Sequence, residues 1–215
     1  ETSLRRSARR LRRELDPHID WGRACALVVT PAWAPWLEEL PFHRVVYHCI
    51  DNWRVHAPPG LESHFEAWEH QLLERADGAI TTAEVLREEI LAQHPGLPVE
   101  LIRNAVDERW LAPATPLRAA RPDRPVVGFV GALYEWLDWD LVEAVTCEMS
   151  NVEFVFVGPD DGRSSLARLN QLDNVHFPGP CAHDAVPSWL AGFDACWVPF
   201  RANPIARATN PIKLY

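Results

Sequence analysis

The sequence lacks several features that would assign a function directly. No run of apolar residues approaches the roughly 18 consecutive positions that a membrane-spanning helix needs. The five Cys contain no CxxC pair and the nine His show no HExxH or HxxxH spacing, which argues against a zinc site. The phrases GxSxG, GxxxxGK and GxGxxG are also missing, which argues against a serine hydrolase, a P-loop enzyme and a nicotinamide-dependent dehydrogenase.

Positive charge is scarce beyond the first 23 residues. The chain carries 21 basic and 30 acidic residues, a formal net charge of −9. Seven Arg and four acidic residues give residues 1–23 a charge of +3, which leaves −12 for the rest. Because affinity for a nucleic-acid backbone needs a broad basic surface, we expect no nucleic-acid partner.

The basic segment has the apolar spacing of a helix over residues 2–15. Leu4, Ala8, Leu11 and Leu15 fall on one face, with arginines around it. Two interpretations stay open: the helix docks on its own domain, or it makes a peripheral contact with the headgroups of an anionic membrane. The first is favoured, because the apolar row must cover the sheet of its own domain.

Cysteine usage bears on the compartment. An odd number of scattered Cys in 215 residues indicates reduced, mostly buried thiols and therefore a cytoplasmic protein. Since the chain starts at Glu1 without Met and stops at Tyr215 inside a predicted helix, we expect a fragment of a longer protein.

Apolar, β-branched runs alternate with helical patterns along the chain. Strands are expected near 24–30, 44–49, 78–82, 99–102, 126–131, 152–158, 175–177 and 195–200, and helices near 2–15, 61–76, 83–93, 137–149, 164–171 and 184–191. This alternation predicts the α/β class with parallel sheets, and continuous apolar strands predict helices on both faces, which is doubly wound architecture. Four Pro within residues 112–125 indicate a linker. We therefore predict domains over 1–112 and 126–215, joined by a linker over 113–125.

Ligands of open α/β sheets bind beyond the carboxyl ends of the strands, so the loops after the strands are the candidate sites. In the second half these loops are 131–133, 158–161, 179–183 and 200–210, and three of them contain Gly, which lets backbone approach a ligand. The acidic pairs 138/140 and 160/161 are interpreted as helix caps or solvated turns, so no metal is expected. Trp33 and Trp36 follow a strand and are interpreted as core residues rather than a pocket lining.

The end of the chain carries the strongest local signal. Asn210 followed by Pro211 is typical of a helix N-cap and first helical position, which predicts a helix from Pro211 with Lys213 in its first turn. The free N–H groups of that turn, together with Lys213, Arg207 and Arg201, would form a site for phosphate or diphosphate. A solvated basic loop before an ordinary helix is the alternative that stays open.

Several phrases follow one another in a specific order. Asn210-Pro211-Ile212-Lys213-Leu214-Tyr215 matches the start of the pattern NPxKxYEYLAxGxPVV, and further phrases occur at 46–52, 69–77, 104–107, 127–133, 156–159, 175–179 and 193–201. This set resembles the GT-B fold glycosyltransferases of family 4, bacterial members in particular, over residues 24–215. Each phrase is weak singly, and their order and spacing give the resemblance its specificity.

The resemblance implies two Rossmann-like doubly wound domains that face a cleft, both incomplete in this fragment. It implies a hexosyltransferase-like enzyme that moves sugar from a nucleotide-diphosphate sugar, its co-substrate, to a glycan or lipid-linked acceptor in cell-surface polysaccharide or glycolipid synthesis. The expected reaction is retaining and needs no metal or other cofactor, because cationic side chains and helix N-termini neutralise the leaving diphosphate. The expected location is the cytoplasm, with the inner face of the plasma membrane as the peripheral contact.

The resemblance also assigns residues. Donor binding is expected at Gly131, Ala132, Leu133, Gly158, Pro180, His183, Arg201, Asn210 and Lys213, with Pro180 to His183 near the base. Lys213 and Arg207 would hold the diphosphate charge, and His48 and Asp51 would face the reacting sugar from the acceptor side.

Three departures from the family pattern leave alternatives open. Ala132 stands where many members have Arg, Ala208 lies where the first Glu of a paired-glutamate motif is expected, and Ala105 replaces the Gly of an NGVD phrase. Ala132 and Ala208 favour a non-catalytic sugar-nucleotide-binding or scaffolding domain. A nucleotide-sugar epimerase of the same fold is the other alternative, although its acidic and histidine catalytic set is not recognisable.

Overall fold

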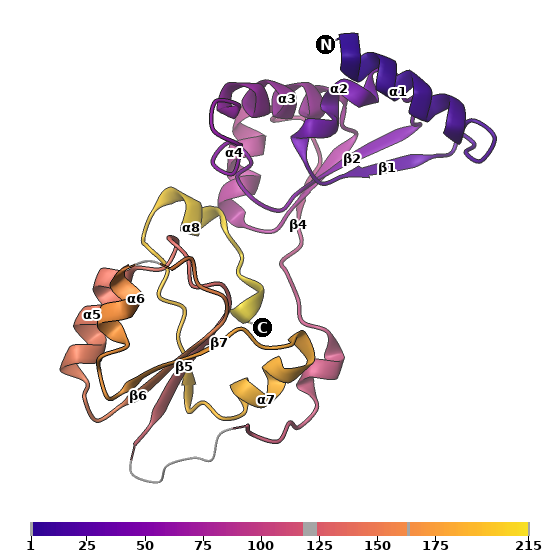
Figure 1. Cartoon of the computed structure of the whole chain (residues 1–215). Coiled ribbons are helices and arrows are strands. Elements are labelled where there is room, and N and C mark those ends of the chain that lie inside the picture. The colour runs from indigo at the N-terminus through magenta and orange to yellow at the C-terminus, as the bar shows by residue number, and fades with distance from the viewer. Residues whose placement is uncertain (1, 118–123, 163, 215) are drawn as a thin grey trace. The chain divides into compact units, whose positions relative to one another are not determined.

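The structure of the chain is a computed structural model that describes residues 2–117, 124–162 and 164–214. Its residues gather in two compact units, each built around one parallel sheet (Figure 1). Unit 1 runs to Asn104 and adds Asn203–Asn210, whereas unit 2 comprises Ala105–Ala202 and resumes at Pro211. The chain therefore passes between the units three times. Tyr215 and positions 118–123 of the expected linker lie outside the described residues.

Unit 1 has a parallel sheet in the order β1-β2-β3-β4. The strands are β1 (Cys25–Val28), β2 (Arg44–Cys49), β3 (Gly78–Thr81) and β4 (Val99–Leu101). The helices are α1 (Thr2–Leu15), α2 (Ala34–Leu37), α3 (Glu62–Arg75), α4 (Glu84–Gln93) and α8 (Pro204–Ala208), with the 3-10 turn η1 (Pro31–Trp33) before α2. Burial alternates along β2, so that Val45, Tyr47 and Cys49 enter the core.

The segment around α8 belongs to unit 1. Oδ1 of Asn203 accepts the Ala206 N–H at 2.9 Å, and Pro204 occupies the first turn, which starts the helix. Ala208 is 1% exposed within the core of unit 1. Beyond the helix, Oδ1 of Asn210 accepts the Asn104 N–H at 2.8 Å, and Nδ2 of Asn104 donates to the carbonyl of Asn210 at 2.6 Å.

A second Asn-Pro phrase, seven residues before the predicted one, also starts a helix. The sequence contains Asn-Pro at 203–204 and again at 210–211, and the first of these caps a helix. The Asn210 side chain bonds to Asn104, and the described residues after Pro211 form the 3-10 turn η4 (Ile212–Leu214), so the prediction of a longer helix from Pro211 stays open.

Unit 2 has a parallel sheet in the order β7-β6-β5-β8. The strands are β5 (Val126–Val130), β6 (Glu153–Val157), β7 (Val175–Gly179) and β8 (Ala195–Cys196). The helices are α5 (Trp139–Glu148), α6 (Ser164–Leu169) and α7 (Val186–Leu190), and the 3-10 turns are η2 (Glu108–Leu111), η3 (His183–Ala185) and η4.

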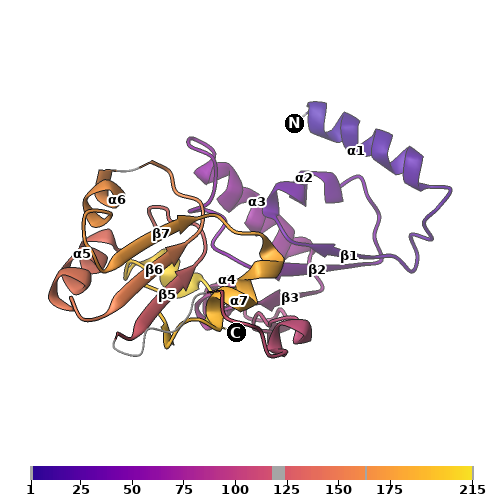
Figure 2. The same cartoon turned by 60° about the horizontal axis from the view of Figure 1, so that its bottom comes forward.

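Both faces of this second sheet are covered. Phe154 and Phe156 pack with residues of α5 and α6, whereas Val155 and Val157 pack toward Trp189 of α7. Figure 2 shows α5 and α6 on one side of the sheet and α7 on the other. All five residues of β6 are buried, as expected for a strand covered on both sides. The predicted α/β class with doubly wound, parallel sheets is confirmed.

The observed units differ from the expected boundaries at residues 112 and 126. The rings of Trp110 and His183 have centroids 4.6 Å apart, and the Leu117 N–H donates to Ser188 O at 3.0 Å. These contacts attach residues 105–117 to unit 2. None of the helices in the described ranges has the length and apolarity that crossing a bilayer requires.

Candidate functional site

The strand order of unit 2 creates a topological switch point between β5 and β8. From β5 the chain builds the sheet outward through β6 and β7, and it then returns to the other side of β5 for β8. Loops at the carboxyl ends of β5 and β8 therefore diverge to opposite faces, and the crevice at such a point is where open α/β sheets bind ligands. The loop after β5 begins at Gly131 and the loop after β8 at Trp197.

Two glycines bring the loops after β5 and β6 into close contact. Gly131 has φ +152° and Gly158 has φ +154°, a backbone conformation that favours glycine. A Cβ on Gly158 would collide with the carbonyl oxygen of Gly131. A Cβ on Gly131 would lie 2.5 Å from Cε of Lys213, so the end of the lysine side chain lies directly against this turn.

The turn over residues 131–133 leaves one backbone donor available. The Gly131 N–H donates to Val157 O at 2.9 Å, and the Leu133 N–H donates to Pro159 O at 2.8 Å. No acceptor for the Ala132 N–H is found among the described residues. A partly exposed amide beside a cation is a suitable donor to an anion.

Lys213, the only lysine of the chain, places its ammonium beside this turn. Nζ lies 5.7 Å from the ring centroid of Phe129 and 5.9 Å from that of Phe200, which are cation–π distances. Although the residue keeps solvent exposure, desolvation by the surrounding protein lowers the pKa of its ammonium. Within the described part of the chain, no carboxylate forms an ion pair with Lys213. An anion would restore the stabilisation that the ammonium loses with its water.

The predicted cationic residues are divided between the units. Lys213 and Arg201 lie in unit 2, whereas Arg207 in the last turn of α8 and Asn210 beyond it lie in unit 1. Nε of Arg201 donates to Leu137 O at 3.2 Å, which ties its side chain to the segment between β5 and α5. The structure thus brings Lys213 to Gly131, and the convergence of Arg207 on the same anion stays a prediction.

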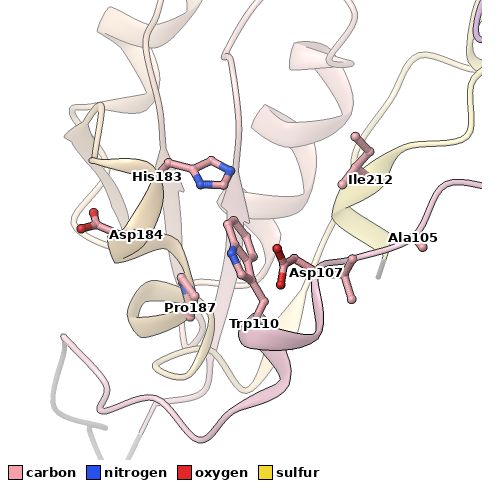
Figure 3. Close-up of a pocket in the computed structure, with 8 residues that line it drawn as sticks. Ala105, Asp107, Trp110, His183, Asp184, Pro187 and Ile212 are labelled. Carbon is pink, nitrogen blue, oxygen red and sulfur yellow. The ribbon is translucent and has the colours of Figure 1, made fainter.

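Two cavities of unit 2 meet at an aromatic pair. The rings of Trp110 and His183 are tilted by 55° at a centroid distance of 4.6 Å. Each of the two residues lines the first cavity as well as the second. One cavity, of about 430 Å³, is also lined by Ala105, Val106, Asp107, Asp184, Pro187 and Ile212. Figure 3 shows its polar groups, with Asp107 beside the Trp110 ring.

The other cavity, of about 310 Å³, reaches the switch point. Residues 128–130 of β5, Cys196 of β8 and Lys213 line it together with α7. Its lining is mostly apolar apart from Lys213 and His183. One pocket is therefore lined both by the Lys213 cation and by the Trp110–His183 ring pair. Sequence reasoning did not single out Trp110.

The remaining donor-side residues take up different positions. Leu133 is 1% exposed in the core of unit 2, so it faces the site only with its backbone. The Gly158 N–H donates to Gly179 O at 3.0 Å, which occupies that donor. Pro180 follows directly after β7 and is exposed, and His183 enters the pocket three residues later.

The predicted acceptor-side residues lie at the carboxyl end of β2 in unit 1. His48 is half-buried on the strand, opposite Ile80 of β3. Oδ1 of Asp51 accepts the Asn52 N–H at 2.9 Å, and Oδ2 lies 3.1 Å from Nε2 of His56. His56 was not singled out from the sequence, because its five-residue separation from Asp51 matches no helix or strand spacing.

Other ionisable groups of unit 1 are engaged in structural contacts. Oη of Tyr47 donates to Oε1 of Glu69 at 2.7 Å, and desolvation raises the pKa of both groups. Burial raises the pKa of the Cys49 thiol to about 12, which keeps it protonated and unreactive. Asp77 accepts the Val45 N–H at 2.9 Å and pairs with Arg44 at 2.7 Å.

One member of each acidic pair caps a helix or a turn. Oδ1 of Asp138 accepts the Leu141 N–H at 3.1 Å at the start of α5, and Oδ1 of Asp160 accepts the Gly162 N–H at 2.8 Å. Across the described ranges, no three His, Cys, Asp or Glu side chains gather as metal ligands.

Comparison with known proteins relates the whole chain to glycosyltransferases. No profile of a known protein family matches the sequence. The chain is 27% identical over 218 residues to TuaH of Bacillus subtilis (strain 168), a protein whose name assigns it to teichuronic acid biosynthesis as a glycosyltransferase. The match covers 94% of this chain and 55% of TuaH, so the chain spans about half the length of this relative.

Solved structures share the fold at low sequence identity. HepE of Anabaena, solved with UDP, has a TM-score of 0.63 at 15% identity, covering 88% of this chain and 55% of HepE. OtsA has a TM-score of 0.66 at 11% identity, covering 90% of this chain and 55% of OtsA. The chain has the GT-B fold of these glycosyltransferases and represents part of it.

Proposed function

We propose that the chain is part of a glycosyltransferase that takes a sugar from a nucleotide-diphosphate sugar, with the donor bound to unit 2. The observation that carries the proposal is the position of the Lys213 ammonium beside the Gly131 turn at the switch point, with no carboxylate partner among the described residues. The similarity to TuaH and the GT-B fold support the same class of enzyme.

The diphosphate would lie between Lys213 and the Ala132 N–H. The ammonium supplies a full charge and the amide a directed donor, and both are already in place before the ligand arrives. Charge-assisted hydrogen bonds of this kind are roughly twice as strong as neutral ones. The close approach of a diphosphate is compatible with a turn whose residues 131 and 132 carry no bulky side chain.

The base would lie against the Trp110–His183 pair. A planar aromatic ring gains energy from stacking on other rings, and the two cavities beside this pair offer room for base and sugar. HepE was solved with UDP and, separately, with UDP-glucose, which makes a uridine nucleotide the first candidate for this site.

In the reaction, the bond between the anomeric carbon of the sugar and the diphosphate oxygen breaks, the acceptor hydroxyl oxygen forms the new bond to that carbon, and the hydroxyl proton passes to the released diphosphate. Negative charge develops on the leaving diphosphate, where Lys213 stabilises it more strongly than in the ground state. The proposal assigns this neutralisation to Lys213, Arg207 and Arg201, so that neither a metal nor another cofactor is required. It also takes the reaction as retaining and hexosyl-transferring, as the family resemblance implies.

Unit 1 would bind the acceptor through His48 and Asp51. The name of TuaH points to a cell-envelope polymer as the acceptor class, so we propose a cell-surface polysaccharide or glycolipid. All five Cys are free, but three of them (Cys25, Cys147 and Cys196) are exposed, so the expectation of mostly buried thiols was wrong. We propose a cytoplasmic location on the free thiols alone.

The test uses the full-length protein with UDP- and GDP-sugars. We expect one nucleotide family to raise the melting temperature, and transfer or hydrolysis of its sugar to follow. Lys213→Ala should remove both effects. Arg168→Ala, which removes an exposed Arg paired with Glu143 at 2.9 Å in the same unit, is the matched control and should leave both intact. Unchanged binding in Lys213→Ala would overturn the proposal.

A non-catalytic sugar-nucleotide-binding domain is the second candidate. It is favoured by Ala132 and Ala208, which replace charged residues of the family pattern. Nucleotide binding that depends on Lys213, without transfer, hydrolysis or epimerisation of the sugar by the full-length protein, would select this candidate.

A further inference from the structure

The loop that follows β2 is fixed by hydrogen bonds at both of its ends. Oγ1 of Thr82, a residue that is 1% exposed, donates to the Ile50 carbonyl at 3.0 Å. Farther along, the Val55 N–H donates to the Asn52 carbonyl at 3.1 Å, and the His56 N–H donates to the same oxygen at 3.4 Å. These last two contacts form a turn that brings His56 back toward the end of the strand.

The same loop holds the carboxylate of Asp51 by both of its oxygens. Oδ1 accepts the Asn52 N–H at 2.9 Å, and Oδ2 lies 3.1 Å from Nε2 of His56. Because a carboxylate accepts and cannot donate, Nε2 is the ring nitrogen that carries the proton. The Asp51 side chain is 27% exposed and that of His56 is 43% exposed, so a ligand can reach the remaining lone pairs of the carboxylate. The pair is therefore oriented in advance at the carboxyl edge of the sheet, where open α/β sheets bind ligands.

No basic side chain of the loop cancels the charge of Asp51. Arg54 pairs instead with Glu66 at 3.4 Å and with Glu89 at 3.5 Å. Over the described ranges, no Arg or Lys forms an ion pair with Asp51. His56 in its neutral form donates a hydrogen bond and adds no positive charge. Such a carboxylate accepts hydrogen bonds from hydroxyls and repels carboxylates and phosphates, so it favours a neutral group that is rich in hydroxyls.

We propose that His56 is a positioning residue, which holds Asp51 against a hydroxyl of a neutral pyranose at the end of the acceptor. The inference rests on the proposed function, which gives acceptor binding to unit 1. Asp51 binds a hydroxyl that does not react, and the proton of the reacting hydroxyl passes to the diphosphate, so His56 takes up no proton in the reaction. Since a pyranose ring is rigid, holding one hydroxyl also places the reacting oxygen, and a misplacement of about 1 Å can lower the rate about a hundredfold.

The test uses the full-length protein, the nucleotide sugar that raises its melting temperature, and synthetic acceptors. The acceptors are the n-octyl β-glycosides of glucose and galactose, each compared with the n-octyl glycoside of its uronic acid. We expect transfer to a neutral glycoside, with kcat/KM at least about tenfold lower for the matching uronic acid. His56→Ala should raise the KM for the neutral glycoside about tenfold, because a hydrogen bond to a charged group is lost. Donor affinity and donor hydrolysis by water should stay within about twofold of the wild-type values, since neither uses the acceptor.

Two variants separate positioning from a general loss of structure. His56→Gln keeps an N–H donor at about the place of Nε2, so its KM should return to within about threefold of the wild-type value. His70→Ala is the matched control, because it removes another pair of a His with an acidic residue in unit 1, in which Nε2 lies 3.8 Å from Oε1 of Glu74. It should leave the KM unchanged, and circular dichroism checks that all variants fold.

The outcomes distinguish this inference from the proposed function. An unchanged KM in His56→Ala, no recovery in His56→Gln, or faster transfer to the uronic acids would overturn the inference while the donor site stands. The same holds if a protein that binds the donor transfers sugar to none of the glycosides. A full-length protein that binds no nucleotide sugar would overturn the proposed function and this inference together.

Discussion

The two units use similar parallel sheets, yet they differ in strand order and in how one charged side chain beside the strand ends is engaged. In unit 1 the strand order follows the chain, and Glu69, Asp77 and Asp51 each have an internal partner. In unit 2 the order reverses at β5, and Lys213 lies at that reversal without a carboxylate partner among the described residues. This difference supports the proposal that unit 2 binds an anionic ligand at Lys213.

The largest expected effect concerns the glycines that build the unit 2 site. Gly158→Ala places a Cβ against the Gly131 carbonyl at a φ of +154°, so we expect a loss of about 4 kcal/mol in unfolding free energy. In unit 1, a Cβ added at Gly96 has no atom within 4 Å, so Gly96→Ala should change the unfolding free energy by less than about 1 kcal/mol. Urea unfolding of both variants measures the difference, and similar midpoints would show that the two strand ends are not in contact.

The next effect concerns ligand affinity. Lys213→Ala removes a charge-assisted contact worth about 1.5–3 kcal/mol, so affinity for a nucleoside diphosphate should fall about 10- to 100-fold by calorimetry. The unit 1 variant Asp51→Asn should leave this affinity unchanged. If Asp51→Asn lowered the affinity for the nucleoside diphosphate as much as Lys213→Ala does, the contrast between the units would fail.

A smaller effect is expected for the buried pair in unit 1. Tyr47→Phe removes the hydroxyl that donates to Glu69 and should cost about 1–2 kcal/mol of unfolding free energy. Because the folded state raises the pKa of Glu69, stability is full below the unfolded pKa and is lost as pH rises through the folded pKa. Glu69→Gln should remove that part of the pH dependence in thermal melts, and an unaltered slope would contradict the assignment.

The smallest expected effect is the pH dependence that Lys213 gives to stability and to diphosphate affinity. Folding lowers the pKa of Lys213, so its charge costs stability in full below the lowered pKa, and this cost disappears as pH rises toward the unfolded value. Diphosphate binding uses the charged form, and its affinity should therefore decline with rising pH through the lowered pKa. In Lys213→Arg the decline should be absent, since guanidinium stays protonated. An equal decline in both proteins would assign it to another group.

The sequence predicted strands and helices well where its apolar residues form a continuous run or recur at helical spacing. Phe154 to Val157 form a continuous apolar run that only a strand covered on both faces tolerates, and helix α1 has the predicted ends. The unit boundaries were not predictable in this way, because they depend on contacts between distant residues such as Trp110 with His183 and Asn104 with Asn210.

The site was predictable only in part. Lys213 and Gly131 were recognised by their place in ordered phrases, and the structure brings them together. The cap of α8 at Asn203 and the bond between Asn210 and Asn104 were not predicted, because the second depends on a residue more than a hundred positions away. Trp110 gave no signal, since a Trp in a turn is typical of core packing.

The most direct measurement is the rate at which an amine-reactive acetylating reagent modifies Lys213 in the full-length protein, followed by peptide mass spectrometry. Its lowered pKa makes the free amine available to the reagent. We predict that inorganic pyrophosphate and a nucleoside diphosphate slow this modification, whereas the corresponding nucleoside does not. Unchanged rates with pyrophosphate, UDP and GDP would contradict the claim that Lys213 is the diphosphate site.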